Sequence, residues 1–452
     1  MKIPENFMIG TSSSSWQIEG NCDKYNDSWA DLFYQTNPML WHNEIGPSKA
    51  SDFYHHYKED IELMSKTGIN TFRFTISWAR FMKDPIQGIV DDNAVKYYLD
   101  VIKTILKFNM KPIISLEHWD IPAILLTKYN GWASRETIKF YETYVEEALK
   151  KFSSYVDIWF AFTEPNIPID NGYMDKLWYP FIHDPQTAYQ AHFHKILATS
   201  KAVKIAHNYK NIKMGAMIHM TPVYAASDKS EDQKAAYYAD LFHVRMYLDA
   251  YLKGQIPSEI FTILKENNCL FTYYPQDLES ILNHTVDILG IDYYFPIRVQ
   301  ARTTKYTGLF HPKKFYEDYI WPLREFNTDR GWEIYPKAIY DIGKRIQNEY
   351  ENADWFISEN GIGIMNESRY LNDKGFIDDD YRIDFLSRHL EQVLKVKEDG
   401  SHCHGYLIWS FIDNVSAINA FKNRYGLLEL DLETYERIPK KSYYWLQSLL
   451  KK

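Results

Sequence analysis

The feature that most constrains this chain is a regular alternation of two kinds of segment. Short runs rich in apolar, β-branched and aromatic residues recur along it, each followed by a longer stretch with the apolar spacing of an amphipathic helix. The eight predicted strands are Phe7–Trp16, Ile69–Trp78, Lys111–Trp119, Val156–Pro165, Ile212–Met220, Val286–Tyr294, Asp354–Glu359 and Gly405–Asn414. The predicted helices lie near residues 53–66, 93–108, 134–152, 187–208, 231–253, 336–349, 380–398 and 440–451.

Eight strand–helix units in one chain predict an α/β fold of a particular kind, the (β/α)8 TIM barrel. We therefore expect residues 1–452 to form a single domain. An open, doubly wound sheet is the alternative, but its first strand normally leads into a glycine-rich phosphate-binding turn. Here the first strand leads into TSSSSWQIEG, which contains no GxGxxG motif. The barrel is the better prediction.

Composition narrows the partners that the chain is expected to have. A formal charge of −9 disfavours nucleic acid, and no run of 18 apolar residues is present to cross a membrane. The three cysteines are far apart, which predicts neither a disulfide framework nor a zinc knuckle, and the N-terminus lacks the apolar core of a signal peptide. We therefore expect a soluble cytoplasmic protein whose partners include neither nucleic acid nor a membrane.

Polar and aromatic residues follow the predicted strands at the ends where a barrel builds its active site. They are Gln17, Arg73, His118, Trp119, Glu164, Tyr294, Glu359 and the run from Trp409 to Asn414. Any one of them alone is most simply a strand cap or a loop residue. Their coincidence at the same strand end favours a functional site, because the carboxyl ends of barrel strands surround one pocket.

Two carboxylates in this set, Glu164 and Glu359, end the fourth and seventh predicted strands. Carboxylates that face each other across a pocket can hydrolyse a glycosidic bond, and separations of about 5–5.5 Å give retention of configuration. The acid must stay protonated, which apolar surroundings favour, and the nucleophile must be ionised, which a cation favours. Glu164 follows an apolar run, and Arg73 is the natural partner of Glu359. The sequence predicts Glu164 as acid/base and Glu359 as nucleophile.

Several longer motifs occur in a fixed order along the chain. They are FMIGTSSSSWQIEG, FRFTISWAR, LEHWDIP, FTEPN, LGIDYY, GWEIYP, ISENG and WSFIDN, followed by the tail RYGLLELDLETYERIPKKSYYWL. In these motifs the chain resembles glycoside hydrolase family 1, the retaining β-glycosidases built on a TIM barrel. The resemblance covers nearly the whole chain.

The resemblance implies roles for individual residues. Glu164 matches the family's acid/base and Glu359 its nucleophile, in agreement with the reasoning above. The remaining matches are Arg73 and Tyr294, which position and charge-stabilise the nucleophile; Gln17, His118 and Trp409, which bind the sugar; and Trp332, the aromatic platform for the leaving group. Trp119 is expected beside the sugar as well. No cofactor is implied.

The chain departs from the family beside the acid/base residue. Thr163 precedes Glu164 where the family usually has an asparagine that holds the sugar 2-hydroxyl. We expect Thr163 to contact the substrate less well, and a lost transition-state contact lowers the rate. Asp292, where the family commonly has asparagine, is a milder change of the same kind.

A second departure concerns the sugar's 6-position. Ser416 and Ala417 stand where most β-glucosidases of the family carry Glu and Trp, and a Glu there would repel a 6-phosphate. Ser416 and Tyr425 match the 6-phospho-β-glycosidase branch, which holds the phosphate with Ser, Lys and Tyr. The Lys position is occupied by Asn423, with Lys422 one residue away as a candidate substitute. In the alternative, Lys422 points outward and Ser416 only fills space.

The predicted function is therefore a retaining β-glycosidase that acts on a small-molecule β-glycoside, a 6-phosphorylated disaccharide or an aryl glycoside. The leading hypothesis is a 6-phospho-β-glucosidase of carbohydrate catabolism. One alternative is a β-glucosidase or β-galactosidase for unphosphorylated sugars. Another is a sugar-binding protein with weak catalysis on the same barrel.

Overall fold

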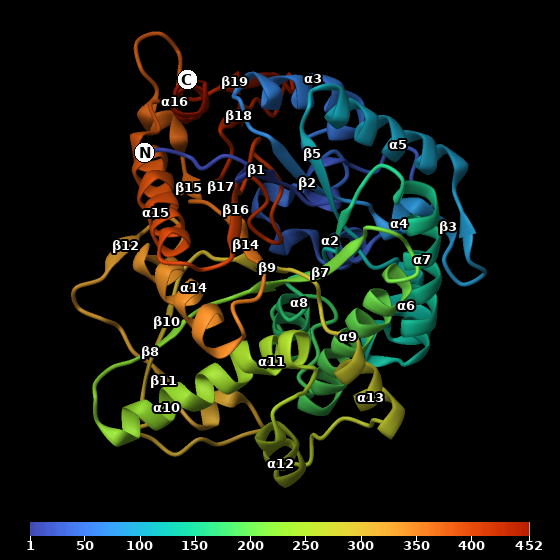
Figure 1. Cartoon of the computed structure of the whole chain (residues 1–452), viewed down its shortest axis with the longest axis vertical. Helices are drawn as coiled ribbons and strands as arrows, with labels where there is room; N and C mark the ends of the chain where they lie inside the picture. Colours follow the sequence, from blue (N-terminus) through green and yellow to red (C-terminus); the bar gives the residue numbers. More distant parts are fainter. Residues whose placement is uncertain (452) are drawn as a thin grey trace.

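The protein folds as a closed barrel of eight parallel strands surrounded by helices (Figure 1). The computed structural model describes residues 1–451. Around the barrel the strands follow the order β1, β2, β5, β6, β7, β9, β14, β16, and β16 pairs with β1 to close it. Their bounds are β1 Met8–Ser12, β2 Thr71–Thr75, β5 Lys111–Ser115, β6 Ile158–Thr163, β7 Lys213–His219, β9 Leu289–Asp292, β14 Trp355–Asn360 and β16 Cys403–Ile408. The TIM-barrel prediction is confirmed.

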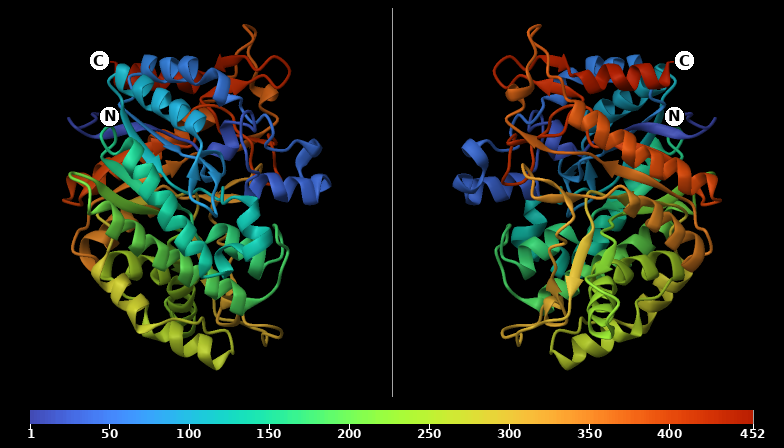
Figure 2. Two further views of the ribbon diagram at one scale, coloured as in Figure 1. Left: turned by 90° about the vertical axis from the view of Figure 1, so that its right-hand side faces the viewer. Right: turned by 90° about the vertical axis from the view of Figure 1, so that its left-hand side faces the viewer.

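Long helices cover the outside of the barrel between successive strands. They are α3 (Phe53–Lys66), α5 (Asp92–Lys107), α7 (Glu136–Phe152), α9 (Pro185–Ala206), α10 (Ser230–Asp240), α11 (Met246–Lys253), α14 (Lys337–Glu349), α15 (Asp380–Glu398) and α16 (Lys441–Leu450). The last of them closes the ring: Tyr443 and Gln447 of α16 donate hydrogen bonds to the carbonyls of Leu63 and Lys66 at the end of α3. The two chain termini also lie near each other in all views (Figures 1 and 2).

Shorter elements decorate the loops. The helices are α1 (Ser15–Ile18), α2 (Trp29–Thr36), α4 (Trp78–Phe81), α6 (Ala123–Tyr129), α8 (Ile167–Ile169), α12 (Ser258–Glu266) and α13 (Pro275–Asn283). The strands are β3 (Met82–Asp84), β4 (Ile89–Val90), β8 (Val223–Ala225), β10 (Ile297–Gln300), β11 (Glu317–Asp318), β12 (Glu325–Asn327), β13 (Trp332–Ile334), β15 (Ile364–Met365), β17 (Asn423–Arg424), β18 (Leu428–Leu430) and β19 (Arg437–Pro439). The blue segment after β1, which includes α2, projects from the body in the side views (Figure 2).

Two layers of apolar side chains hold the barrel together. The inner layer fills the barrel with Ile113, Ile158, Phe160, Met217, Ile288, Phe356 and Leu407. The outer layer lies between strands and helices, where the amphipathic helix faces predicted from the sequence are buried. Because the interior is packed solid, no pore runs through the barrel of the described chain, and an active site must be built at the ends of its strands.

The strands that carry the two predicted carboxylates are irregular at their carboxyl ends. The pairing of β6 with β7 shifts register between Phe160 and Thr163, and that of β14 with β9 shifts between Ile357 and Glu359. Such bulges re-aim side chains and are common beside active sites. Within residues 1–451, every helix is too short or too polar to span a bilayer.

Candidate active site

Glu164 follows β6 directly, in a backbone conformation that is unusual for a glutamate. Its backbone φ angle is 47°, in the left-handed region that residues other than glycine rarely adopt. Its amide nitrogen donates a hydrogen bond to the carbonyl of Met217, 3.0 Å away, and its carbonyl accepts one from Trp119 Nε1 at 3.2 Å. The neighbouring strand and the indole therefore hold a strained conformation in place, which is typical of functional sites.

Glu359, near the end of β14, is surrounded by hydrogen-bond donors and positive charge. Tyr294 donates its hydroxyl to Glu359 Oε2 at 2.7 Å, and the buried guanidinium of Arg73 forms an ion pair with Oε1. Arg73 is itself held by the carbonyl of Ser13 at 2.8 Å. His118 Nδ1 lies 4.0 Å from Oε1, and burial lowers the pKa of His118 well below its usual value, so this imidazole is neutral. These contacts favour the ionised form of Glu359.

Glu164 has the opposite environment. Its side chain is buried, and among residues 1–451 no group donates a hydrogen bond to its carboxyl oxygens. Burial raises the pKa of Glu164 well above its usual value, and the charges of Glu359 and Asp292 raise it further. Burial also raises the pKa of Glu359, but Arg73 and Tyr294 oppose that increase. A proton shared by the pair therefore resides on Glu164.

Asp292 places a third carboxyl beside this pair. Its Oδ1 accepts a hydrogen bond from Ser358 Oγ at 2.7 Å, and its buried Oδ2 has no partner within the described residues. Burial and then the charge of Glu359 raise the pKa of Asp292 well above its usual value. A neutral, protonated Asp292 resembles in charge the asparagine that the family commonly has there.

One oxygen from each of Glu164, Asp292 and Glu359 lies within 4.8 Å of the others. Such a cluster can in principle hold a cation. Arg73 already supplies positive charge to Glu359, and the raised pKa values of the other two carboxyls work against metal binding, because metal ligands must be deprotonated. The arrangement fits proton exchange between the carboxyls better than a metal site.

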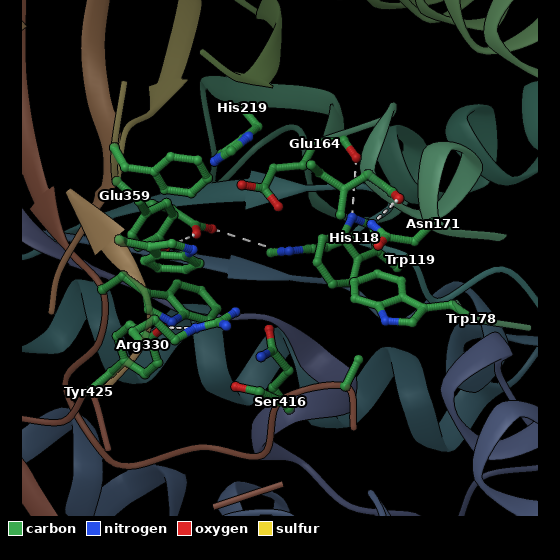
Figure 3. Close-up of a pocket in the computed structure, with 17 residues that line it drawn as sticks. His118, Trp119, Glu164, Asn171, Trp178, His219, Arg330, Glu359, Ser416 and Tyr425 are labelled. Carbon is green, nitrogen blue, oxygen red and sulfur yellow. Dashed lines mark hydrogen bonds and ion pairs between the residues drawn. The ribbon is translucent and has the colours of Figure 1, made fainter. Parts of the chain in front are cut away.

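These carboxylates open into a pocket of about 320 Å³ (Figure 3). The predicted site residues that line it are Gln17, His118, Trp119, Glu164, Tyr294, Trp332, Glu359, Trp409, Ser416 and Tyr425. Arg73 lies behind Glu359, fully buried. The indole of Trp332 stacks on Phe295, with ring centroids 4.9 Å apart, which presents a rigid aromatic surface at the pocket. The sequence therefore located most of the pocket from strand ends and motifs.

Three predicted substrate-binding residues lie elsewhere, and their assignment is corrected. Thr163 is fully buried and faces the barrel interior, where its hydroxyl pairs with Ser115 Oγ at 2.8 Å. Lys422 is exposed and lines a separate cavity. Asn423 is buried and donates a hydrogen bond to a backbone carbonyl at 3.2 Å. Neither Lys422 nor Asn423 is among the residues that line the pocket of the two carboxylates.

The pocket also contains residues that sequence reasoning missed. They are Ile167, Asn171, Trp178, His219, Phe295 and Arg330. Most come from long loops whose course the sequence does not predict. Arg330 had a usable signal, because it immediately precedes the GWEIYP motif that contains Trp332.

Comparison with known proteins decides the family. The model of the family described as Glycosyl hydrolase family 1 matches residues 1–452. The chain belongs to this family. It is a β-glycosidase, as the motifs predicted, and its relatives in the family differ in the sugars that their names give as substrates.

Three relatives show the range of these names and the degree of similarity to this chain. The 6-phospho-beta-glucosidase GmuD of Bacillus subtilis is 38% identical over 455 residues, which cover 99% of this chain and 97% of the relative. A 6-phospho-beta-galactosidase of Clostridium acetobutylicum is 31% identical, covering 98% of this chain and 96% of its own length. The solved structure of a family 1 β-glucosidase from Thermotoga maritima has a TM-score of 0.91 at 29% identity, covering 100% of this chain and 98% of that one.

Proposed function

We propose that this glycosidase hydrolyses 6-phospho-β-glucosides with retention of configuration. Glu359 attacks the anomeric carbon while Glu164 donates its proton to the departing glycosidic oxygen. Water then enters, Glu164 takes its proton, and the oxygen attacks the anomeric carbon and releases the sugar from Glu359. The spacing within 4.8 Å supports retention, because inverting enzymes need about 6.5–9.5 Å between carboxylates to admit water.

The environments of the two carboxylates support this division of roles. The ion pair with Arg73 and the hydroxyl of Tyr294 favour an ionised nucleophile. Glu164 is buried and its carboxyl receives no hydrogen bond from a donor within residues 1–451, which raises its pKa and favours its protonated form. As the first step proceeds, Glu359 loses its charge, so the pKa of Glu164 falls and the residue becomes able to act as base.

The observation that carries the phosphate specificity is Ser416 in the pocket wall. Ser416 lies on the side of the pocket away from Glu164 and Glu359 (Figure 3), and these two are the only carboxylates among the pocket's lining residues within the described chain. A phosphate therefore meets no carboxylate at that wall. The similarity to the 6-phospho-beta-glucosidase GmuD supports the same substrate class.

The direct test compares kcat/KM for 4-nitrophenyl β-glucoside with and without a 6-phosphate. We expect the phosphorylated substrate to be preferred by at least about tenfold, since each hydrogen bond to a charged group contributes roughly 1.5–3 kcal/mol. A preference for the unphosphorylated glucoside would contradict the proposal and favour an ordinary β-glucosidase.

A further inference from the structure

Arg330 lies in a turn between two short strands at the mouth of the pocket. The turn joins β12 to β13, and Gly331 has a φ of +82°, which glycine adopts without strain. Arg330 is the residue with a permanent positive charge among those that line the pocket within the described chain. The pocket's histidines do not add charge, because burial lowers the pKa of His118 well below its usual value and that of His219 to about 4.

This turn is firmly anchored. Asn327 Oδ1 accepts a hydrogen bond from the amide of Asp329 at 3.1 Å, and Asn327 Nδ2 donates one to the carbonyl of Gly363 at 3.0 Å. The carboxylate of Asp329 forms an ion pair with Arg369 and accepts a hydrogen bond from the amide of Met365 at 3.2 Å. The backbone that carries Arg330 is thus fixed before any ligand arrives.

Asn423 supplies one more anchor from the other side. Its Nδ2 donates a hydrogen bond to the carbonyl of Asp329, 3.2 Å away, immediately before Arg330. Residue 423 is also the position where the 6-phospho branch is expected to carry its phosphate-binding lysine. In this chain the side chain at that position holds the turn that brings a different cation to the pocket.

The guanidinium of Arg330 is held in place but its charge is not neutralised. It stacks over the indole of Trp332, 4.0 Å from the ring centroid, and its Nε donates to Tyr425 Oη at 3.1 Å (Figure 3). No Asp or Glu of residues 1–451 forms an ion pair with it. Its remaining N–H groups are therefore available to a ligand.

Two neutral hydrogen-bond donors, the hydroxyls of Tyr425 and Ser416, line the same pocket as Arg330 (Figure 3). Tyr425 Oη accepts from Arg330, so its own hydrogen is free to be donated. Burial raises the pKa of Tyr425, which keeps that hydrogen in place. Ser416 stands on a different loop, whose backbone is fixed by the hydrogen bond from Gln17 Nε2 to the carbonyl of Val415 at 2.8 Å. The combination of one planar cation and two hydroxyls matches a phosphate, whose oxygens accept hydrogen bonds and carry negative charge.

We propose that Arg330 is the cation that binds the 6-phosphate of the substrate, in place of the lysine absent from position 423. The inference rests on the proposed function. Arginine suits this position because its planar fork forms two parallel hydrogen bonds to phosphate, whereas lysine is a flexible point charge. In this proposal the positive charge comes from a different loop than in the 6-phospho branch, but the pocket still offers a cation, a serine and a tyrosine to the phosphate.

The test measures the phosphate preference, defined as kcat/KM for 4-nitrophenyl β-glucoside 6-phosphate divided by that for 4-nitrophenyl β-glucoside. We expect R330M to reduce this ratio by about 10- to 100-fold, the equivalent of one hydrogen-bonded charge. R330K should fall between R330M and the wild type. The matched control is K422M, which removes an exposed lysine outside the pocket and should leave the ratio within about twofold of the wild type.

A rescue experiment tests whether the two positions serve the same group. Adding N423K to R330M returns a cation to the usual position, and we expect the ratio to recover by at least about threefold. Failure of this rescue would overturn the claim that Arg330 replaces the lysine. Thermal melting of each variant, and its rate on the unphosphorylated substrate, report whether it has folded. If R330M does not fold, the same comparison is made with R330K.

The outcomes separate this inference from the proposed function. A wild type that does not prefer the phosphorylated substrate overturns both. A wild type that does, with an R330M variant that keeps the full preference, overturns the role of Arg330 alone. Loss of activity on 4-carboxyphenyl β-glucoside, with the phosphate preference intact, would instead assign Arg330 to an anionic leaving group beside Trp332.

Discussion

The catalytic end of the barrel and the pocket wall around Ser416 are built in different ways. The catalytic carboxylates stand at the ends of β6 and β14, and their partners Arg73 and Tyr294 come from β2 and from just beyond β9. The wall is made by loops: the turn at 327–331 and the segment from Ser416 to Tyr425. Hydrogen bonds between neighbouring strands fix the position of a side chain at a strand end. A catalytic role there therefore requires a particular residue at a particular position in the sequence.

Loops relax that dependence. A loop can deliver a cation from any position that reaches the wall, provided that the backbone is anchored. Arg330, held through Asp329 and Asn423, illustrates how a charge can move by about ninety residues in sequence and stay in the same pocket. Catalytic residues of this protein can therefore be found from their positions in sequence motifs, whereas residues that set its specificity must be found from the three-dimensional structure.

The largest effect is expected at Glu359. Replacement by glutamine, E359Q, should reduce kcat by at least about 10⁴-fold, because no covalent intermediate can form without the nucleophile. Steady-state kinetics on the phosphorylated nitrophenyl substrate measures it, and substrate binding to the variant should persist. A sugar-binding protein with incidental activity would show little change, so a small effect favours that alternative.

Replacement of Glu164 should have a smaller effect that depends on the leaving group. We expect E164Q to lose about 10²- to 10⁴-fold on substrates with alkyl leaving groups, the usual contribution of general acid–base catalysis. Dinitrophenolate departs without protonation, so the first step with that substrate should be nearly preserved and turnover should respond to added azide. An equal loss on both substrates would argue against Glu164 as the acid.

Asp292 tests how the carboxyls share protons. Burial is the main cause of the raised pKa of Glu164, and the charge of Asp292 adds to it. Because Glu164 must be protonated to act as acid, activity is lost as pH rises through its pKa. Asp292 carries that charge only above its own raised pKa. D292N removes the charge and so lowers the pKa of Glu164 in that pH range, and the alkaline limb of kcat/KM should move to lower pH by about one unit.

The pH profiles of wild type and D292N, measured on the same substrate, check this shift. An alkaline limb that stays in place, or moves to higher pH, would show that Asp292 does not interact electrostatically with Glu164. S358A gives a graded comparison, since it removes the hydrogen bond that lowers the pKa of Asp292 without removing the carboxyl. Asp292 is then ionised less, and the alkaline limb should move in the same direction as in D292N, but by less.

The smallest catalytic effect is expected at Thr163. Its hydroxyl pairs with Ser115 inside the barrel, so T163V should lower the free energy of unfolding by about 1–3 kcal/mol by leaving Ser115 without a partner. The value of kcat/KM should stay within about threefold. S115A/T163V removes both partners and should recover part of the lost stability in a denaturant titration. A large loss of kcat at unchanged stability would return Thr163 to the substrate site.

The sequence predicted the fold and the catalytic centre because both rest on local, periodic signals. Alternation of apolar runs and amphipathic stretches identifies the strands and helices, and the residue after each strand is brought to the barrel mouth by the fold itself. Glu164, Glu359, Arg73 and Tyr294 are all of this kind. Their mutual contacts follow from the closed order of the strands.

The wall was harder to predict because its residues are placed by long-range contacts. Lys422 was chosen for its closeness in sequence to the missing lysine, but it precedes the short strand β17 and lines another cavity. Thr163 was assigned to the substrate from its place beside Glu164, yet its hydroxyl pairs with Ser115 inside the barrel, whereas Glu164 lines the pocket. Arg330 is held at the pocket by bonds between distant parts of the chain, such as those from Asn423 to Asp329 and from Asn327 to Gly363.

The central claim is that Glu359 is the nucleophile of a 6-phosphoglucosidase. It is tested most directly by trapping the intermediate with a 2-deoxy-2-fluoro-β-glucoside 6-phosphate that carries a dinitrophenyl leaving group, followed by digestion and mass spectrometry. We expect one fluorinated sugar phosphate per chain, attached to Glu359 and formed faster than with the reagent that lacks phosphate. Label on another residue, or faster labelling by the unphosphorylated reagent, would contradict it.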